Sequence, residues 1–117
     1  MQGTEGYYQV TSQEFLDQWN TLAQESKLVA IFMSGLEESG KYWCPDCEAT
    51  RDNLNNVLVP TAREKGIKAY HVDAGNRETW KNPENPLRKN EAFPVTKIPT
   101  IILFENVMIN CLSQFLK

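Results

Sequence analysis

Hydrophobic and polar positions along the chain predict β-strands interleaved with helices. Residues 12–26 carry apolar side chains at helical spacing, with Phe15 and Trp19 on the apolar stripe. The run from Leu28 to Met33 is continuously apolar and has the length of a strand, a pattern typical of a central strand covered on both faces. The other predicted strands are residues 7–10, 67–73, 100–104 and 107–109.

Capping and breaking residues indicate where the helices begin and end. Thr11 followed by Glu14 has the pattern of a capping box, which predicts that a helix begins after Thr11. Pro45 suits the first position of a second helix, where its missing N–H costs nothing. We expect Pro60 to kink or end this helix and Gly66 to mark its final stop.

The predicted order of elements is β-α-β-α-β-(α)-β-β-α. The bracketed element is a short helix in the polar, irregular stretch 74–91, and a last helix begins near Asn110. A strand–helix–strand unit forces a right-handed crossover with parallel pairing, whereas a tight turn at Glu105-Asn106 joins the last two strands as an antiparallel hairpin. The sequence therefore predicts an α/β fold with a mixed central sheet, helices on both faces and one domain over residues 1–117.

Composition and charge narrow the classes of function. The chain has 117 residues and a formal net charge of −3 without a basic block, which argues against nucleic acid as a partner. The longest apolar run is far shorter than the ~20 residues that span a bilayer, so we expect no membrane insertion. The first residues carry no secretory signal and the cysteines number three, which together indicate the reducing cytoplasm. We also expect a monomer.

The motif that carries chemistry is Trp43-Cys44-Pro45-Asp46-Cys47, between the second predicted strand and the second predicted helix. A Cys-x-x-Cys in this position predicts a dithiol that cycles with a disulfide. Unpaired N–H groups and the positive dipole end at the start of a helix favour the thiolate form of Cys44, and the thiolate is the nucleophile. The connection 34–43 is long for a strand-to-helix loop and leads into the cysteines, so we expect it to shape the site.

A zinc site is the structural alternative for the same two cysteines. A structural zinc ion needs four ligands, and only Cys111 and His71 remain, both distant in sequence. Redox chemistry is therefore the favoured interpretation. We interpret Cys111 as a small buried hydrophobic residue and His71 as a structural residue of its strand.

The Cys-Pro-x-Cys motif after the second strand, together with Ile98-Pro99-Thr100 before the fourth, resembles the thioredoxin fold. The full Trp-Cys-Pro-Asp-Cys sequence narrows the resemblance to small thioredoxin-related proteins of the thioredoxin domain-containing protein 17 type. The other segments that match this family are Gly40-Lys41, Trp80-Lys81 with Pro83 and Asn85, Arg88-Lys89-Asn90, and Val95-Thr96.

This resemblance implies a disulfide reductase in which Cys44 attacks, Cys47 resolves and Pro99 is a cis-proline. It implies no bound cofactor, because the redox-active group is a Cys44–Cys47 disulfide that receives electrons from NADPH through thioredoxin reductase. The implied substrates are disulfide-containing proteins or cystine-like small molecules. The expected substrate contacts are Trp43, Ile98, Pro99 and Trp80, and the remaining motif residues are Pro45 and Asp46.

The chain departs from thioredoxin itself in one respect that bears on mechanism. Thioredoxin has a buried aspartate in its second strand, whereas Ala30-Ile31-Phe32 offers no carboxylate, so proton transfer at Cys47 requires another group or water. The short turn after the fourth strand lacks glycine, and the last helix is short. Both features predict a less stable C-terminal end and do not affect the chemistry of the cysteines. The runner-up function is a binding or signalling adaptor on the same fold, whose redox state gates association.

Overall fold

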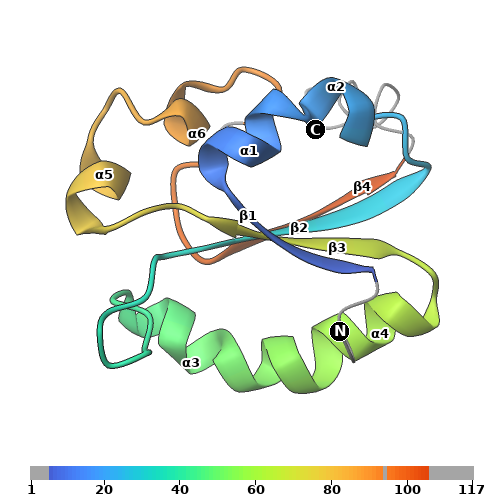
Figure 1. Cartoon of the computed structure of the whole chain (residues 1–117), viewed down its shortest axis with the longest axis horizontal. Helices are drawn as coiled ribbons and strands as arrows, with labels where there is room; N and C mark the ends of the chain where they lie inside the picture. Colours follow the sequence, from blue (N-terminus) through green and yellow to red (C-terminus); the bar gives the residue numbers. More distant parts are fainter. Residues whose placement is uncertain (1–5, 94, 106–117) are drawn as a thin grey trace.

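The computed structural model describes residues 6–93 and 95–105, which form a mixed sheet covered by helices on both faces (Figure 1). Its strands stand in the order β1-β3-β2-β4. β1 and β2 pair parallel with β3, and β2 pairs antiparallel with β4, so the predicted mixed α/β sheet is confirmed. The strands are β1 (Tyr7–Thr11), β2 (Lys27–Met33), β3 (Lys68–Asp73) and β4 (Thr100–Glu105).

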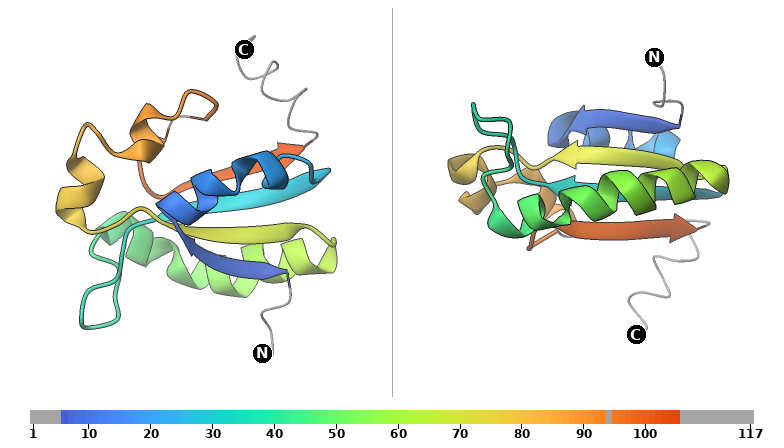
Figure 2. Two further views of the ribbon diagram at one scale, coloured as in Figure 1. Left: turned by 45° about the horizontal axis from the view of Figure 1, so that its top comes forward. Right: turned by 90° about the horizontal axis from the view of Figure 1, so that it is seen from below.

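The strand β2 is the buried centre of the sheet, as its apolar run predicts. Every side chain from Leu28 to Met33 is buried. Successive side chains of a strand point to opposite faces, so Phe32 enters a cluster with Phe15, whereas Ile31 enters a second cluster with Cys47. Figure 2 shows the two helical layers that enclose these clusters.

The helical segment after β1 begins as predicted but is divided. Thr11 Oγ1 accepts a hydrogen bond from the Glu14 N–H at 3.0 Å, and Glu14 Oε1 accepts one from the Thr11 N–H at 2.8 Å, which confirms the capping box. The single helix predicted over 12–26 is two helices, α1 (Ser12–Asp17) and α2 (Trp19–Leu22). Gln18 separates them with φ −94° and ψ 2°, outside the range of a regular helix.

The helix that begins at Pro45 runs through Pro60, so of the two outcomes expected at Pro60, a kink or an end, the end is wrong. It consists of α3 (Pro45–Asn53), the π-helical turn η1 (Leu54–Leu58) and α4 (Val59–Glu64). Proline lacks an N–H and clashes with the carbonyl four residues before it. In η1 the Val59 N–H instead reaches back to the Leu54 carbonyl, so the helical bonding pattern is already shifted directly before Pro60.

Gly66 ends this helix as predicted. It has φ +72°, a left-handed conformation that glycine adopts without steric cost, and its N–H donates to the Arg63 carbonyl at 3.0 Å. The adjacent Ile67 N–H donates to the Ala62 carbonyl at 2.8 Å, and the chain then enters β3.

The stretch after β3 holds two short helices where one was predicted, α5 (Arg77–Lys81) and α6 (Pro86–Lys89). Asn85 joins them, because its side chain caps α6 at the Leu87 N–H and donates to the Thr79 carbonyl at 2.8 Å. None of the helices within residues 6–93 and 95–105 has the length and apolar character needed to cross a bilayer. The predicted turn after Glu105, the strand 107–109, the last helix and Cys111 lie outside the described residues.

Candidate active site

The two cysteines lie where the carboxyl end of β2 leads into α3, as the sequence predicts. Cys44 is the N-cap of α3 in an extended conformation, and Pro45 occupies the first turn. Both cysteines are free thiols. Cys44 is 8% exposed, whereas Cys47 is 0% exposed and lies in the core beneath it. Both thiols are therefore buried, but Cys44 keeps a small exposed fraction whereas Cys47 has none.

Ser34, the residue that follows β2, contacts both cysteines. Its backbone N–H donates to the Sγ of Cys47 at 3.3 Å, and its Oγ accepts a hydrogen bond from the Cys44 N–H at 3.2 Å. The Ser34 hydroxyl in turn donates to the Gly35 carbonyl at 3.1 Å. One buried serine thus fixes the start of α3 relative to the end of β2.

Burial raises the pKa of Cys47 from its usual 9.0 to about 12, and the Cys44 thiol adds to this effect. The Ser34 N–H acts in the opposite direction, because it stabilises the thiolate. No carboxylate of β2 lies beneath the pair, in agreement with the departure from thioredoxin noted in the sequence. Cys47 is therefore a protonated thiol at neutral pH, and it must give up its proton when it reacts.

The segment before β4 lies beside Cys44. The Ile98–Pro99 peptide bond is cis, as the resemblance implied. The Cys44 thiol donates to the Ile98 carbonyl, with Sγ and O 3.7 Å apart. Ile98 and Pro99 are both half-buried, so this segment forms one wall next to the Cys44 sulfur.

Trp43 is held on the other side by the chain that leaves β3. Its Nε1–H donates to the Gly75 carbonyl at 2.9 Å, and the guanidinium of Arg77 lies over its ring, 4.7 Å from the centroid. Trp43 is half-buried, so part of the indole remains at the surface beside Cys44. The indole is thus fixed in place by two contacts that the sequence did not reveal.

Trp80 does not line this rim, which corrects the expectation that it contacts substrate there. Its side chain is 5% exposed and belongs to the cluster around Phe15. The guanidinium of Arg88 covers the ring at 4.1 Å, and its Nε–H donates to the Trp80 carbonyl at 2.7 Å. The indole is a core residue of α5, so it offers no free surface to a substrate.

The long connection between β2 and α3 is clamped onto α3. The Tyr42 N–H donates to Glu48 Oε1 at 2.9 Å, and this hydrogen bond is the main reason why the pKa of Glu48 is lowered. Arg51 donates to the same carboxylate at 3.1 Å and to the Gly40 carbonyl at 2.6 Å. The Glu48 charge is therefore engaged by the loop rather than directed at Cys44.

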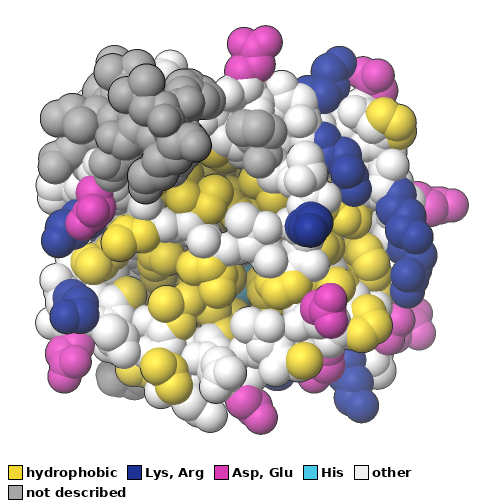
Figure 3. Space-filling view, turned by 180° about the vertical axis from the view of Figure 1, so that it is seen from behind, with side chains coloured by type: hydrophobic (Ala, Val, Ile, Leu, Met, Phe, Trp, Pro, Cys, Tyr) yellow, Lys and Arg dark blue, Asp and Glu magenta, His cyan; other side chains and the backbone are white. Residues whose placement is uncertain are grey.

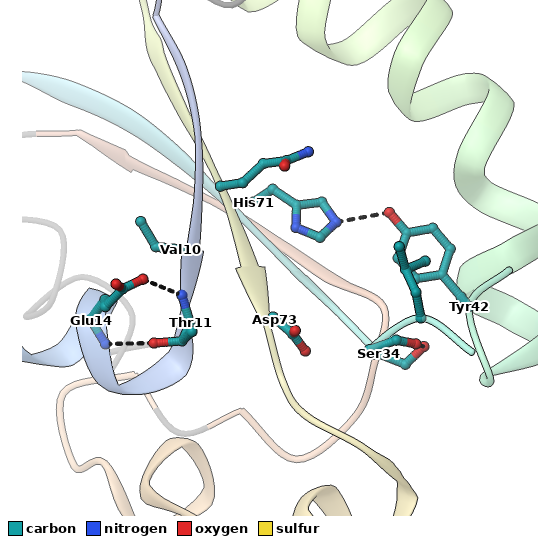
Figure 4. A pocket seen from close by; sticks show the side chains of 10 residues that line it. Val10, Thr11, Glu14, Ser34, Tyr42, His71 and Asp73 are labelled. Atoms are coloured by element: carbon teal, nitrogen blue, oxygen red, sulfur yellow. Dashed lines mark hydrogen bonds between the residues drawn. The ribbon is translucent and has the colours of Figure 1, made fainter. Parts of the chain in front are cut away.

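A cavity of about 260 Å³ is lined by residues of β1, β3 and this loop (Figure 4). The Tyr42 hydroxyl and His71 Nε2 form a hydrogen bond of 2.8 Å in its wall, and Ser34 and Asp73 also line it. His71 is 9% exposed, and burial lowers its pKa. The imidazole is therefore neutral near neutral pH, and its hydrogen bond to Tyr42 fits the structural role expected for it.

Sequence reasoning missed Ser34, Tyr42 and Arg77 as residues of the site. Ser34 had one usable signal, since it is a polar residue that ends a wholly apolar run just before the cysteines. No comparable signal exists for Arg77, which meets Trp43 only because β2 and β3 are neighbours in the sheet. Within residues 6–93 and 95–105, no three His, Cys, Asp or Glu side chains gather to form a candidate metal site.

Comparisons with known proteins agree with this geometry. Residues 7–114 match the family model described as thioredoxin domain-containing protein 17-like, thioredoxin domain. The chain is similar to the thioredoxin-like protein Clot of Oryza sativa subsp. japonica, with 29% identity over 82 residues, 68% of this chain and 59% of that protein. It is 35% identical to the Clot protein of Arabidopsis thaliana over 68 residues, 57% of this chain and 48% of that protein.

A similar match is found in animals. The chain is 30% identical to thioredoxin domain-containing protein 17 of Homo sapiens over 81 residues, 66% of this chain and 59% of that protein. The matched part of the chain thus spans 59%, 48% and 59% of the length of these three curated relatives.

Proposed function

The chain belongs to the thioredoxin domain-containing protein 17-like family, and from this we propose that it is a thiol–disulfide oxidoreductase that reduces disulfides. The observation that carries the proposal is the unequal placement of the two cysteines on an α/β thioredoxin fold. Cys44 caps a helix and retains 8% of its exposure, whereas Cys47 is fully buried in the first turn of the same helix. This arrangement suits an attacking thiol that meets substrate and a resolving thiol that does not.

In the first step, Cys44 loses its proton to solvent and its thiolate attacks one sulfur of a substrate disulfide. A Cys44–substrate bond forms, the substrate S–S bond breaks, and the first substrate thiolate leaves and takes up a proton. The N-terminal end of α3 favours the attacking anion, because the first N–H groups of a helix have no partner within the helix.

In the second step, Cys47 attacks the Sγ of Cys44. The mixed disulfide breaks, the second substrate thiolate leaves, and the proton from Cys47 balances the charge on that leaving thiolate. The substrate has then gained two electrons and the protein holds a Cys44–Cys47 disulfide. The high pKa of Cys47 keeps this thiol protonated until the mixed disulfide stands next to it.

We propose that thioredoxin reductase returns the disulfide to the dithiol with electrons from NADPH, without a cofactor bound to this chain. The proposed substrates are disulfide-containing proteins and cystine-like small disulfides. Trp43 directly precedes Cys44, and the Ile98 carbonyl accepts a hydrogen bond from the Cys44 thiol, which supports Trp43 and the Ile98–Pro99 segment as surfaces against which a substrate lies. Pairing of an extended substrate with the Ile98 backbone would follow the pattern of strand addition.

The test is consumption of NADPH by the chain with thioredoxin reductase and cystine, compared with Cys44→Ser. Turnover that disappears in Cys44→Ser supports the proposal, because this substitution removes the nucleophile. Cys47→Ser is the matched variant, and it should accumulate mixed disulfides that mass spectrometry detects. Absence of turnover in the unsubstituted protein, with both thiols shown to be reactive, would overturn the reductase and favour the redox-gated adaptor.

A further inference from the structure

One cation of the described residues is stacked on the indole of the candidate active-site motif. The guanidinium of Arg77 lies 4.7 Å from the centroid of Trp43, the residue directly before Cys44. The Trp43 ring is itself fixed by its hydrogen bond to Gly75, so the platform beneath the guanidinium has a defined position. Arg77 is an exposed residue at the first position of α5. A charged group is thus presented against the indole that directly precedes Cys44 in the chain.

Arg77 has no anionic partner among residues 6–93 and 95–105, unlike its basic neighbours on α6. Lys89 pairs with Glu84 at 2.8 Å, and Arg88 donates to the Trp80 carbonyl. The Arg77 side chain forms no ion pair or hydrogen bond within the described part of the chain, and its electrostatic contact there is the stacking of the guanidinium on Trp43. Its planar set of N–H donors is therefore free to bind a ligand.

The charges on this side of the molecule are mixed, so any attraction for an anion must come from a local cation. Figure 3 shows Lys and Arg side chains interspersed with Asp and Glu along the edge of the molecule at which α5 and α6 lie. Glu48, in the first turn of α3, is already engaged by Tyr42 and Arg51. Asp46 is exposed in the same turn and repels anions, so attraction for an anion is confined to the side of Cys44 where Trp43 and Arg77 lie.

We propose that Arg77 is a specificity residue that selects disulfides carrying a carboxylate close to the S–S bond. A guanidinium binds a carboxylate through two parallel hydrogen bonds, and stacking on Trp43 orients its plane before the substrate arrives. A carboxylate held there would place the neighbouring disulfide beside Trp43 and Cys44. This inference rests on the proposed reductase activity and names the class of substrate.

The test measures reduction of three small disulfides by the pre-reduced chain, followed by stopped-flow tryptophan fluorescence. The probes are dithiodipropionate, which is anionic, bis(2-hydroxyethyl) disulfide, which is neutral, and cystamine, which is cationic. We expect the second-order rate constant to be highest for the anionic probe, intermediate for the neutral probe and lowest for the cationic probe. In Arg77→Gln the ratio of the anionic to the neutral rate constant should fall about two- to fivefold, the range of an exposed charge interaction. Raising the salt concentration should reduce the same ratio in the unsubstituted protein.

Two variants separate a local effect from overall charge. Lys81→Gln removes one positive charge from the same helix α5, and the ratio should stay as in the unsubstituted protein. Arg77→Lys keeps the charge and loses the planar fork, so part of the preference should return. An equal fall of the ratio in Lys81→Gln and Arg77→Gln would overturn the assignment to Arg77.

The carboxylate can belong to a small molecule or to an acidic residue of a protein, and a second experiment distinguishes these sources. It compares disulfide-bonded peptides with Glu or Gln beside the cysteine. An Arg77-dependent preference in the peptides indicates a protein source, and a preference confined to dithiodipropionate indicates a small molecule. Equal rates for all probes would overturn the inference while leaving the reductase intact. Failure to reduce any probe would overturn the proposed function, and with it this inference.

Discussion

The backbone N–H of Ser34 lies 3.3 Å from the Sγ of Cys47 and donates a hydrogen bond to it. The residue that ends the central strand thus supports the buried thiol, at a site where β2 contributes no carboxylate. Because this donor belongs to the backbone, it persists in any substitution of the serine side chain other than proline. The Ser34 hydroxyl makes a separate contact, since its oxygen accepts a hydrogen bond from the Cys44 N–H.

Replacement of Ser34 by alanine should therefore destabilise the reduced protein. The substitution keeps the backbone donor to Cys47 but leaves the buried Cys44 N–H without its acceptor, at a cost of about 1–3 kcal/mol. Urea unfolding followed by fluorescence measures the change. The matched control is Ser39→Ala in the exposed loop, which should change stability by less than about 0.5 kcal/mol. Equal stability of the two variants would contradict the role given to the Ser34 hydroxyl.

Cys47 should resist alkylation at neutral pH in the Cys44→Ser variant. Burial is the largest cause of its raised pKa and does not depend on the other thiol. Labelling with iodoacetamide, read by peptide mass spectrometry, should increase only well above pH 9.0, the usual pKa of a cysteine. The urea-unfolded variant is the control and should titrate near that usual value. Half-labelling of the folded variant below pH 9.0 would contradict the raised pKa.

The same pKa shift predicts that the reduced protein loses stability in alkali. The folded state retains the Cys47 proton up to a pKa of about 12, whereas the unfolded chain releases it near 9.0. The unfolded state therefore binds fewer protons in this window, and the free energy of unfolding falls as the pH rises through it. The comparison is Cys47→Ala, in which this part of the alkaline loss should be absent. Parallel pH profiles for the two proteins would contradict the prediction.

The pair of Tyr42 and His71 should make stability sensitive to acid. Burial lowers the pKa of His71 from 6.5, and Arg51 adds to this, whereas Asp73 acts in the opposite direction. The unfolded chain takes up the proton first, so stability is complete above pH 6.5 and is lost as the pH falls below it. Urea midpoints at about pH 7 and about pH 5 measure the loss. His71→Gln should show a smaller loss, and an unchanged loss would contradict this assignment.

Removal of the Tyr42 hydroxyl tests the hydrogen bond of this pair directly. Tyr42→Phe keeps the ring stacked on His71 but removes the 2.8 Å hydrogen bond, which should cost about 0.5–1.5 kcal/mol in the free energy of unfolding. Tyr8→Phe is the control, because Tyr8 is exposed and also stacks on a ring, that of Tyr70. A change of equal size in both variants would show that the Tyr42 hydroxyl is not specifically bound.

Arg51 should hold the loop before the cysteines in place. Its guanidinium donates to the Gly40 carbonyl and to Glu48, and it stacks on the Tyr42 ring at 4.7 Å. Arg51→Ala removes all three contacts, so local opening of the loop should become more frequent. Tryptic cleavage after Lys41, followed by mass spectrometry, should then be at least about twofold faster, since local opening exposes the peptide bond.

Lys65→Ala is the control for that measurement, since Lys65 is exposed at the far end of the same helical segment. Trypsin should cleave the Lys65→Ala variant after Lys41 at the same rate as the unsubstituted protein. If trypsin also cleaves the Arg51→Ala variant after Lys41 at that rate, the position of the loop does not depend on the Arg51 contacts.

The structure corrects the sequence analysis most clearly at Trp80 and Pro60. Trp80 lies in a polar stretch that reads as surface, yet α5 and α6 fold over the sheet and bury the indole beneath Arg88. Pro60 ends helices in most contexts, but the turn before it takes up π-helical bonding and the helix continues. The error at Trp80 arises because tertiary packing overrides a local rule, whereas at Pro60 the shifted bonding of the preceding turn lets the helix continue.

Local signals allowed much of the chain to be predicted from sequence alone. The buried central strand, the capping box at Thr11, the stop at Gly66 and the placement of Cys44 and Cys47 all depend on residues close together in sequence. Hydrogen bonding and steric preferences of neighbouring residues determine such features, so they can be predicted before the fold is known.

Only the tertiary structure decided which groups surround the cysteines. Ser34 meets Cys47, Tyr42 meets His71, and Arg77 meets Trp43 across separations of sequence that no local pattern spans. These contacts form because the sheet order β1-β3-β2-β4 places the carboxyl ends of β2 and β3 side by side, next to the start of α3. Sequence determined the dithiol, whereas the packing of strands and loops determined the burial of Cys47 and the cation that lies on Trp43.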